Sequence, residues 1–261
     1  MEWLFKTYAF ILGSMLGSLA NVLILRIPIE KSVVLPSSCC PSCNTKLRWY
    51  MNIPLISFLV LRAKCAFCKK RISWQYPLVE IICALFAVWI FPQDLSLVSI
   101  LYFLFYLLFF VALIVHLFID LKHQILPDSI NLFLLSMLLP FSAYQFHWQH
   151  WVLGAAIGFV GTYFVTWLFY KIKGQIGLGG GDIKLFGVLG LFLGPYGIVQ
   201  NIFTSCLLGS IIGLILLAFK KLDRNTPLAF GPFIIIVAIW QIYLPELFKK
   251  FLSAIFYTSS F

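Results

Sequence analysis

The feature that most constrains this chain is a series of apolar runs that recurs from one end of the sequence to the other. A helix needs about 20 consecutive apolar residues to cross the hydrocarbon core of a bilayer. The composition agrees, because 62% of the 261 residues are hydrophobic and only 11% are charged. Soluble domains are roughly half apolar and a quarter charged. We therefore expect an all-α polytopic membrane protein.

The apolar runs predict about eight transmembrane helices. The boundary between the sixth and seventh spans rests on the turn-like cluster Gly194-Pro195-Tyr196-Gly197. An even number of spans places both termini on the same side of the membrane. The expected spans are 5–25, 77–93, 97–119, 129–146, 152–170, 183–199, 201–219 and 229–246.

Basic residues orient this arrangement. The net charge of +10 would suit a nucleic-acid partner, but Lys and Arg concentrate in segments between the spans, as in cytoplasmic loops. Between Arg26 and Arg71 the only acid is Glu30. We therefore expect the chain to lie in a lipid bilayer and to bind no nucleic acid. Three further loops are assigned to the inside. The first holds Lys122 and His123, the second holds Lys171, Lys173 and Lys184, and the third holds Lys220, Lys221 and Arg224. Lys249 and Lys250 are the exception, because they are basic residues on the predicted outside.

Two cysteine pairs mark the long basic loop between the first two spans. Cys40-Pro41-Ser42-Cys43 and Cys65-Ala66-Phe67-Cys68 form a C-x2-C, x21, C-x2-C pattern. Four thiolates at such spacing bind one Zn²⁺ tetrahedrally, and the metal would supply folding energy to a loop without an obvious core. The alternative is two reduced pairs without a metal. The predicted domains are a first transmembrane helix at 1–26, a cytoplasmic zinc-binding loop at 27–76 and a membrane core at 77–261.

Four acids fall at the predicted inside ends of spans: Glu80, Asp120, Asp128 and Asp182. Ionisable groups at membrane depth are costly, so a functional role is the default hypothesis. Asp120 ends the third span and Asp182 follows the run Gly179–Gly181. Two carboxylates from distant segments would act as an acid and a base that activate a water molecule. The glycine run, including Gly179 and Gly181, would permit unusual backbone shapes and close approach of a substrate strand.

Each of these polar residues also has an ordinary interpretation. Asp120 could be a polar helix end, and Asp182 could be an N-cap. An N-cap of the fourth span explains Asp128. Glu80 could pair with a basic loop residue or contact a substrate amine. Lys184 is expected to extend its amine toward the membrane interface.

The first span carries small residues four apart, with Asn21 one turn further along the same stripe. Gly13-Ser14 and Gly17-Ser18 would let a neighbouring helix approach closely in lipid. Asn21 would then be a polar anchor in a helix contact. The alternative, functional interpretation places Asn21 near a substrate groove.

Taken in order, these motifs resemble the type IV prepilin peptidase family, whose G-x-G-D signature is shared with other intramembrane aspartic peptidases. The resemblance runs nearly from end to end, with departures at Ala20 and at the additional Cys39. The matching segments are Gly17–Val22, Arg26–Pro28, Ser38–Cys43, Asn52–Ser57, Pro77–Glu80, Ile119–Asp128 and Gly179–Leu185.

The resemblance implies an aspartic endopeptidase of the bacterial cytoplasmic (inner) membrane. Such enzymes cleave type IV prepilins or pseudopilins of pilus, secretion and DNA-uptake systems, after a Gly and on the cytoplasmic side. Many members then methylate the new N-terminus with S-adenosylmethionine. Asp120 and Asp182 match the catalytic pair, and Cys40, Cys43, Cys65 and Cys68 match the metal tetrad. Residues 77–261 would be the peptidase core, and residues 27–76 would include the methyltransferase region.

Three alternatives stay open from the sequence. The chain could be a peptidase without methyltransferase activity. It could be a proton-coupled transporter in which Asp120 and Asp182 carry protons and zinc stabilises the loop. It could also be a zinc-loop scaffold without catalysis, which would tolerate Asn at both positions.

Overall fold

We describe a computed structural model of the chain for residues 2–34, 39–40, 43, 45–175, 177–219 and 229–256. The predicted basic cluster of Lys220, Lys221 and Arg224 lies outside the described residues, as does Ser38 at the start of one family motif. The chain forms two compact units, residues 1–119 and 120–261. Each unit is described separately below.

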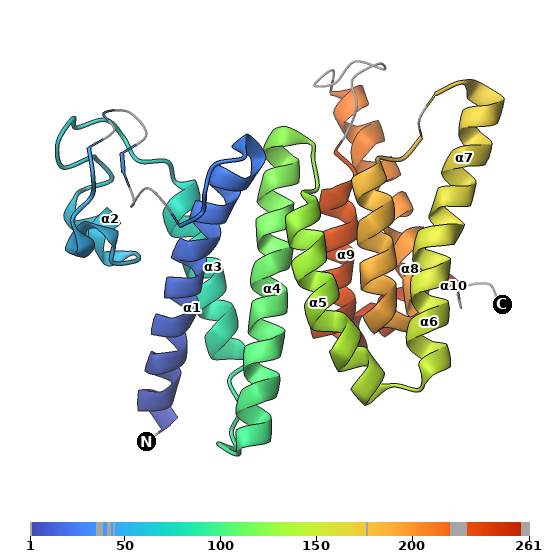
Figure 1. Ribbon diagram of the computed structural model, residues 1–261, viewed down its shortest axis with the longest axis horizontal. Helices are drawn as coiled ribbons and strands as arrows, with labels where there is room; N and C mark the ends of the chain where they lie inside the picture. Colours follow the sequence, from blue (N-terminus) through green and yellow to red (C-terminus); the bar gives the residue numbers. More distant parts are fainter. Residues whose placement is uncertain are drawn as a thin grey trace. The chain divides into compact units, whose positions relative to one another are not determined.

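The first unit contains α1 (Glu2–Arg26), a 3-10 turn η1 (Ile27–Ile29), a second turn η2 (Trp49–Asn52), the short α2 (Ile56–Val60), α3 (Gln75–Trp89) and most of α4 (Leu97–His123). The second unit begins in the last turn of α4. It continues through α5 (Asp128–Gln145), α6 (Trp148–Ala156), the π-helical η3 (Ile157–Gly161), α7 (Thr162–Lys173), α8 (Gly180–Ala218), α9 (Gly231–Tyr243) and α10 (Pro245–Phe256) (Figure 1).

The all-helical expectation is confirmed, since the described residues form helices and turns with only isolated β-bridges in the cysteine loop. Among the described residues, four helical stretches are long and apolar enough to cross a membrane, and a bent pair formed by α9 and α10 brings the number to five. The predicted number of eight is not confirmed. Predicted span 77–93 corresponds to α3, which has only 15 residues. The four stretches are Trp3–Ile29, Leu97–His123, Trp148–Lys173 and Gly180–Ala218.

The predicted sixth and seventh spans both fall within α8, which consists of two helices separated by a sharp break at Gly194. Gly194 has φ 69° and ψ −178°, a conformation that glycine adopts without the steric cost of a Cβ. Pro195 follows and lacks a backbone N–H to continue the helical ladder. The sequence therefore located the break in the correct cluster, but the predicted boundary between residues 199 and 201 is wrong.

In the first unit α1 packs closely against α3, as the small-residue stripe predicts. A Cβ on Gly17 would lie 2.7 Å from the Cα of Glu80, and one on Gly13 would lie 2.5 Å from the carbonyl oxygen of Cys83. Side chains at these positions would push the helices apart. Further along α3, Phe86 stacks on Phe110 of α4 with ring centroids 3.6 Å apart.

In the second unit α8 is the central helix and contacts α5, α6 and α9 (Figure 1). Polar contacts tie its second half to α9, where Gln241 donates to the carbonyl of Gly197 at 2.8 Å and accepts from Asn201 at 3.3 Å. Such side chains join helices in a lipid environment. After α9 the chain bends by 113°, and α10 packs Phe248 and Leu252 against Val237.

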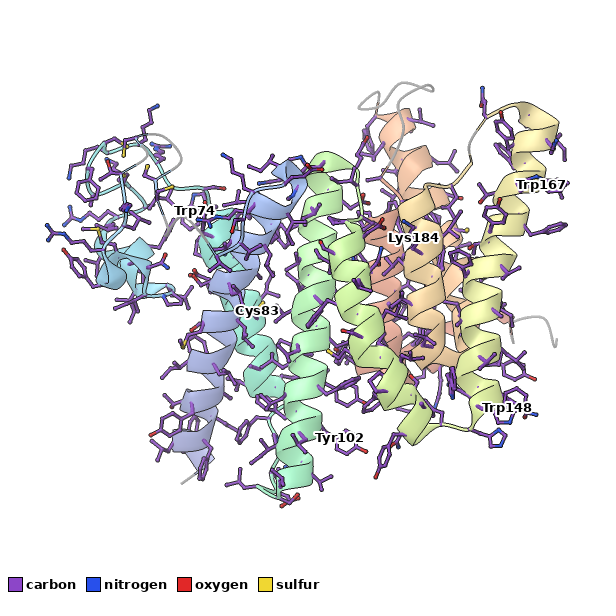
Figure 2. The ribbon with its side chains drawn as sticks, viewed as in Figure 1. Trp74, Cys83, Tyr102, Trp148, Trp167 and Lys184 are labelled. Atoms are coloured by element: carbon purple, nitrogen blue, oxygen red, sulfur yellow. The ribbon has the colours of Figure 1, made fainter. Side chains whose placement is uncertain are left out.

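The α6–η3–α7 stretch carries a tryptophan near each end. Figure 2 shows Trp148 at the start of α6 and Trp167 toward the end of α7. Their exposed fractions are 57% and 44%. The helical rise separates them by about 28 Å, close to the thickness of a bilayer core of about 30 Å. Tryptophan is enriched at the two membrane interfaces, so this stretch has the length and the ends of one full span.

Candidate active site and metal centre

Asp120 lies in the last turn of α4 and is only 4% exposed. Its carboxylate lies against the first residue of α9, Gly231. A Cβ at position 231 would come within 2.6 Å of Asp120 Oδ2. The bare backbone of Gly231 therefore makes room for the carboxylate at the positive end of the α9 dipole. The sequence did not identify Gly231 as a site residue, because only the packing of α9 gives it this role.

Asp182 lies in the first turn of α8, which begins at Gly180. The N-cap residue is Gly179, so the interpretation of Asp182 as an N-cap is wrong. The Gly179 amide donates a hydrogen bond to the Asp182 carboxylate. This is the return bond that an acid at the third helical position makes to the N-cap. The predicted span start at 183 missed this turn because a run of three glycines disfavours helix in isolation.

The glycine run before Asp182 has ordinary backbone angles, contrary to expectation. Among the described residues only Gly174 and Gly194 are glycines with positive φ. Gly179 is extended, with φ −66° and ψ 146°. Gly181 is required for a different reason: there is no space for a side chain, since a Cβ there would lie 2.9 Å from the Cβ of Leu126. Gly180 has no atom within 4 Å of such a Cβ.

The second unit brings the two aspartates close enough for the charge of Asp120 to act on Asp182. One acid comes from the end of α4 and the other from the start of α8. Asp120 faces the N-terminus of α9, and Asp182 lies in the first turn of α8. At each N-terminus the helix dipole stabilises negative charge. Two neighbouring carboxyl groups share one proton more readily than they both ionise. The arrangement can therefore supply an acid and a base to one bound water.

Asp128 and Lys184 form an ion pair beside this site. Lys184 Nζ lies 2.7 Å from both carboxylate oxygens of Asp128. Asp128 is the first residue of α5 and Pro127 is its N-cap, so the predicted capping role of Asp128 is wrong. Figure 2 shows Lys184 near the start of α8. The pair therefore joins the beginnings of α5 and α8, and the amine of Lys184 has a specific partner.

Glu80 and Asn21 hold the first unit together at the base of the cysteine loop. Glu80 is 7% exposed, and its Oε2 accepts a hydrogen bond from the Leu55 amide at 2.8 Å. It binds the loop backbone, whereas the sequence suggested a basic partner or a substrate amine. Asn21 is 1% exposed and donates to the Tyr76 carbonyl at 3.0 Å. The interpretation of Asn21 as a polar anchor agrees with this contact.

The four predicted metal ligands converge. Ligand atoms of Cys40, Cys43, Cys65 and Cys68 all lie within 4.8 Å of one another, and the sulfurs of Cys40 and Cys68 are 3.8 Å apart. Zinc–sulfur bonds of about 2.3 Å in a tetrahedron separate the sulfurs by about 3.8 Å. The thiol donor set and its spacing thus fit a structural zinc ion. Cys39, Cys83 and Cys206 are not part of this cluster.

Each cysteine pair lies in a similar small hairpin. The Cys40 amide donates to the Thr45 carbonyl at 3.0 Å, and the Cys65 amide donates to the Lys70 carbonyl at 2.9 Å. Hydrogen bonds from Thr45 lower the pKa of Cys43 to about 6. A thiolate is the form of cysteine that binds zinc. Sequence reasoning missed Thr45 and Lys70, although each stands two residues after the second cysteine of its pair.

Two parts of the chain match known protein families. Residues 11–93 match the bacterial peptidase A24 N-terminal domain, and residues 107–214 match the type IV leader peptidase family. A protein of Stutzerimonas stutzeri is 33% identical over 89% of this chain and 88% of its own length. The chain belongs to the type IV leader peptidase family.

Other relatives give the same result for this type IV leader peptidase. A Xanthomonas campestris protein is 35% identical and a Pseudomonas aeruginosa protein is 32% identical, each over 89% of this chain and 88% of the relative. All three relatives carry the name prepilin leader peptidase/N-methyltransferase. No solved structure matches the chain. Asp120 and Asp182 fall within the 107–214 match, whereas Gly231 lies beyond it.

Proposed function

We propose that this chain is a prepilin leader peptidase that also methylates its product. It cleaves type IV prepilins or pseudopilins after a Gly, with Asp120 and Asp182 as the catalytic pair. The observation that carries this proposal is the meeting of these two acids in the second unit, at the N-termini of α8 and α9. The names of the relatives supply the substrate class and the second activity.

The chemistry needs one ionised and one protonated carboxyl group. The ionised group takes a proton from water while the water oxygen bonds to the carbonyl carbon of the peptide bond. The protonated group donates its proton to the carbonyl oxygen, which gives a neutral tetrahedral intermediate. The carbon–nitrogen bond then breaks, and the amine leaves with the proton first taken from water. At the same time the other carboxylate takes back one hydroxyl proton of the intermediate, so that the new carboxyl group forms and the pair returns to its starting state. Each carboxyl group thus acts once as acid and once as base.

The charges of the second unit support a site that faces the cytoplasm. Lys171 and Lys173 end α7, and a short connection leads from them to Asp182 at the start of α8. Lys122 follows Asp120 in the last turn of α4. Basic residues near span ends favour the cytoplasmic side. In this proposal the protein is a multi-pass protein of the bacterial inner membrane with its dyad at the cytoplasmic end.

In this proposal residues 27–76 include the methyltransferase region, and a metal ion stabilises the fold of their cysteine loop. Cys40, Cys43, Cys65 and Cys68 would hold a Zn²⁺ ion that contributes free energy to the folding of residues 27–76. The methyl donor, S-adenosylmethionine, would supply an activated methyl group to the new N-terminal amine. Residues 27–76 contain no glycine, and hence no glycine-rich turn of the kind that cradles nucleotides. No residue is assigned to the donor.

The test uses purified full-length protein in detergent with a prepilin-like peptide and S-adenosylmethionine, followed by mass spectrometry. We expect a product cut after the Gly that carries one added methyl group. A cut product without a methyl group would show that the chain is a peptidase without methyltransferase activity. An uncut peptide, together with proton-coupled flux in vesicles, would replace the proposal by the transporter alternative.

A further inference from the structure

The short helix α2 of the cysteine loop carries an apolar patch of three large side chains. Ile56, Leu59 and Val60 are 58%, 74% and 73% exposed. Their spacing of three and four residues places them on one face of α2, and the buried Phe58 lies on the opposite face. Spans expose such residues to lipid, but α2 has only five residues and cannot cross a bilayer. An apolar patch outside the spans indicates a surface that binds a partner or a membrane.

Two contacts hold α2 beside the first turns of α3. The Leu55 amide, directly before α2, donates to the Glu80 carboxylate at 2.8 Å. The ring of Phe58 lies 5.1 Å from the ring of Trp74, measured between their centroids. Trp74 directly precedes α3 and is 74% exposed, and Figure 2 shows it beside the cysteine loop. Because tryptophan is enriched at membrane interfaces, Trp74 marks the level at which α3 enters the bilayer.

The contact with Glu80 gives the depth of α2. From Trp74 to Glu80 the helix rises by about 9 Å, so Leu55 is bound about 9 Å inside the interface. Figure 1 agrees, since α2 is level with the C-terminal half of α1 and not beyond its end. Helices that lie on a membrane bury their apolar face about 5–10 Å into the boundary between head groups and acyl chains. Phe58 points back to Trp74, so the apolar patch on the opposite face points toward the acyl chains.

The basic hairpin that follows α2, residues 62–71, concentrates positive charge. It contains no acid and five basic residues, all exposed: Arg62, Lys64, Lys69, Lys70 and Arg71. Lys64 and Arg71 face each other in an isolated antiparallel β-bridge, where like charges are destabilising. Neither forms an ion pair among the described residues. Four thiolates with one Zn²⁺ would have a net charge of about −2, which two of the five cations balance. The remaining positive charge favours an anionic partner.

We propose that the cysteine loop docks on the membrane: the apolar patch of α2 inserts among the acyl chains, and the basic hairpin binds the phosphate groups of anionic lipids. An apolar face next to a cluster of Lys and Arg is the pattern of segments that bind anionic membranes. The orientation of the protein makes this the cytoplasmic leaflet, and only this choice of leaflet rests on the proposed function. Docking would keep the proposed methyltransferase region at the membrane surface.

A protein partner is the competing occupant of the apolar patch, because its acidic side chains could pair with the basic hairpin. Such a partner would have to cover α2 at a level about 9 Å inside the interface. At this level α3 itself exposes Leu78 and Ile81, by 49% and 41%, as a span does toward lipid. A partner from the aqueous phase would have to displace that lipid. The depth of α2 therefore favours lipid as the occupant.

The first test measures the surroundings of α2 in full-length protein, reconstituted in vesicles of phosphatidylcholine and phosphatidylglycerol. An encoded fluorescent amino acid replaces Leu59 in one variant and Ser32, an exposed polar residue of the same loop, in a matched control. Lipids brominated on the acyl chain should quench the probe at position 59 and not the probe at position 32. Iodide on both sides of the membrane should do the reverse.

Each other result of this test overturns the inference. Quenching of position 59 by iodide would place α2 in water. Protection of position 59 from both quenchers would show that protein, such as a second copy of the chain, covers the apolar patch. Neither measurement uses a prepilin, so a wild type that cleaves no prepilin would count against the proposed function alone.

The second test removes the facing charges of the basic hairpin. Lys64→Gln with Arg71→Gln should raise the phosphatidylglycerol fraction needed for half-maximal quenching at position 59. The docking equilibrium should fall about fivefold for each basic residue removed from an anionic surface. Lys249→Gln with Lys250→Gln removes the same charge from exposed positions of α10 and should leave the curve unchanged. The Tm of both variants in detergent should match the wild type, because exposed substitutions change stability little. Equal curves for the two variants, or quenching that ignores phosphatidylglycerol, would overturn the role of anionic lipid.

Discussion

Glu80 in α3 binds the backbone of Leu55, which lies in the cysteine loop far earlier in the sequence, at 2.8 Å from its amide nitrogen. Leu55 has φ 61° and ψ −50°, a conformation that is strained for a branched side chain. The hydrogen bond from the buried carboxylate of Glu80 therefore stabilises the strained backbone conformation of Leu55. This contact links the membrane-embedded part of the first unit to the fold of its loop.

The contact predicts that Glu80 matters more for methylation than for cleavage. Glu80→Ala leaves the Leu55 amide without its acceptor, at a cost of about 1–3 kcal/mol, and loosens the loop. Glu80→Gln keeps an acceptor oxygen and should have a smaller effect. Mass spectrometry of the product gives the methylated fraction and the cut fraction in one experiment. Glu30→Gln, an exposed acid of the same segment, is the control. Equal losses of both activities would instead make the loop a brace for the whole enzyme.

A second prediction concerns the dyad. Asp120→Asn and Asp182→Asn keep the size of the side chain and remove the proton transfer, so each should lower the cleavage rate by about 10²–10⁴-fold or more. Asp128→Asn should be milder, because an exposed ion pair contributes at most about 1 kcal/mol and Asn still accepts from Lys184. Peptide cleavage is measured with circular dichroism of each variant as a check on folding. Substantial turnover by Asp120→Asn or Asp182→Asn would remove the pair from its proposed role.

Asp120 and Asp182, the residues of the proposed dyad, could be singled out from the sequence because charged residues are rare within apolar runs. The sequence did not predict the start of α8 at Gly180 or the contact of Gly231 with Asp120. Glycines suggest flexibility when they are read locally. Here they are needed because neighbouring atoms leave no room for a Cβ, and only the tertiary packing shows which atoms those are.

The number of spans was harder to predict than their approximate positions. Hydropathy places a helix but does not determine where it ends. The 15-residue α3 was therefore predicted as the span 77–93, and the two halves of α8 were predicted to meet between residues 199 and 201, although the break is at Gly194. The convergence of Cys40, Cys43, Cys65 and Cys68 was predictable, because metal binding by thiolates requires both this residue type and this spacing. The hairpin bonds around them were not, because they involve backbone groups that any residue carries.

A third prediction uses a matched pair of glycines at the dyad. Gly231→Ala would place a Cβ 2.6 Å from Asp120 Oδ2, and a displaced catalytic group costs about 100-fold in rate. Gly180→Ala meets no atom within 4 Å and should leave cleavage unchanged, with a gain of about 0.5–1 kcal/mol in helix stability. Rates and unfolding temperatures of both variants are measured side by side. Equal activity of the two would show that Asp120 does not depend on the space at Gly231.

A fourth prediction concerns the metal. Protein purified with reductant should contain about one Zn²⁺ per chain, because four thiolates complete one tetrahedral site. Cys40→Ser or Cys68→Ser should lose the metal and destabilise the loop, since three thiolates hold it less well. Cys39→Ala, which changes a neighbour outside the cluster, should retain it. Elemental analysis provides the measurement, and a metal-free wild type would refute the zinc site.

The last prediction concerns the side of the membrane on which the dyad lies. Gln175 lies in the connection between α7 and α8, close in sequence to Asp182, and Gln149 lies near the start of α6 at the other end of that stretch. Both side chains are exposed, as is Ser32 in the basic loop. Single cysteines at these positions should therefore report opposite sides of the bilayer. A membrane-impermeant maleimide added to intact cells should label Gln149→Cys and miss Gln175→Cys and Ser32→Cys.

Two controls make this result decisive. The parent chain carries Cys206→Ala, because Cys206 is an exposed native cysteine, and its remaining labelling sets the background. Permeabilised cells should label all three positions, which shows that each cysteine is reactive. Labelling of Gln175→Cys from outside would put the basic ends of α7 and α8 on the outer face, against the positive-inside rule. The dyad would then be out of reach of a leader peptide that remains in the cytoplasm, and the proposed cleavage could not occur there.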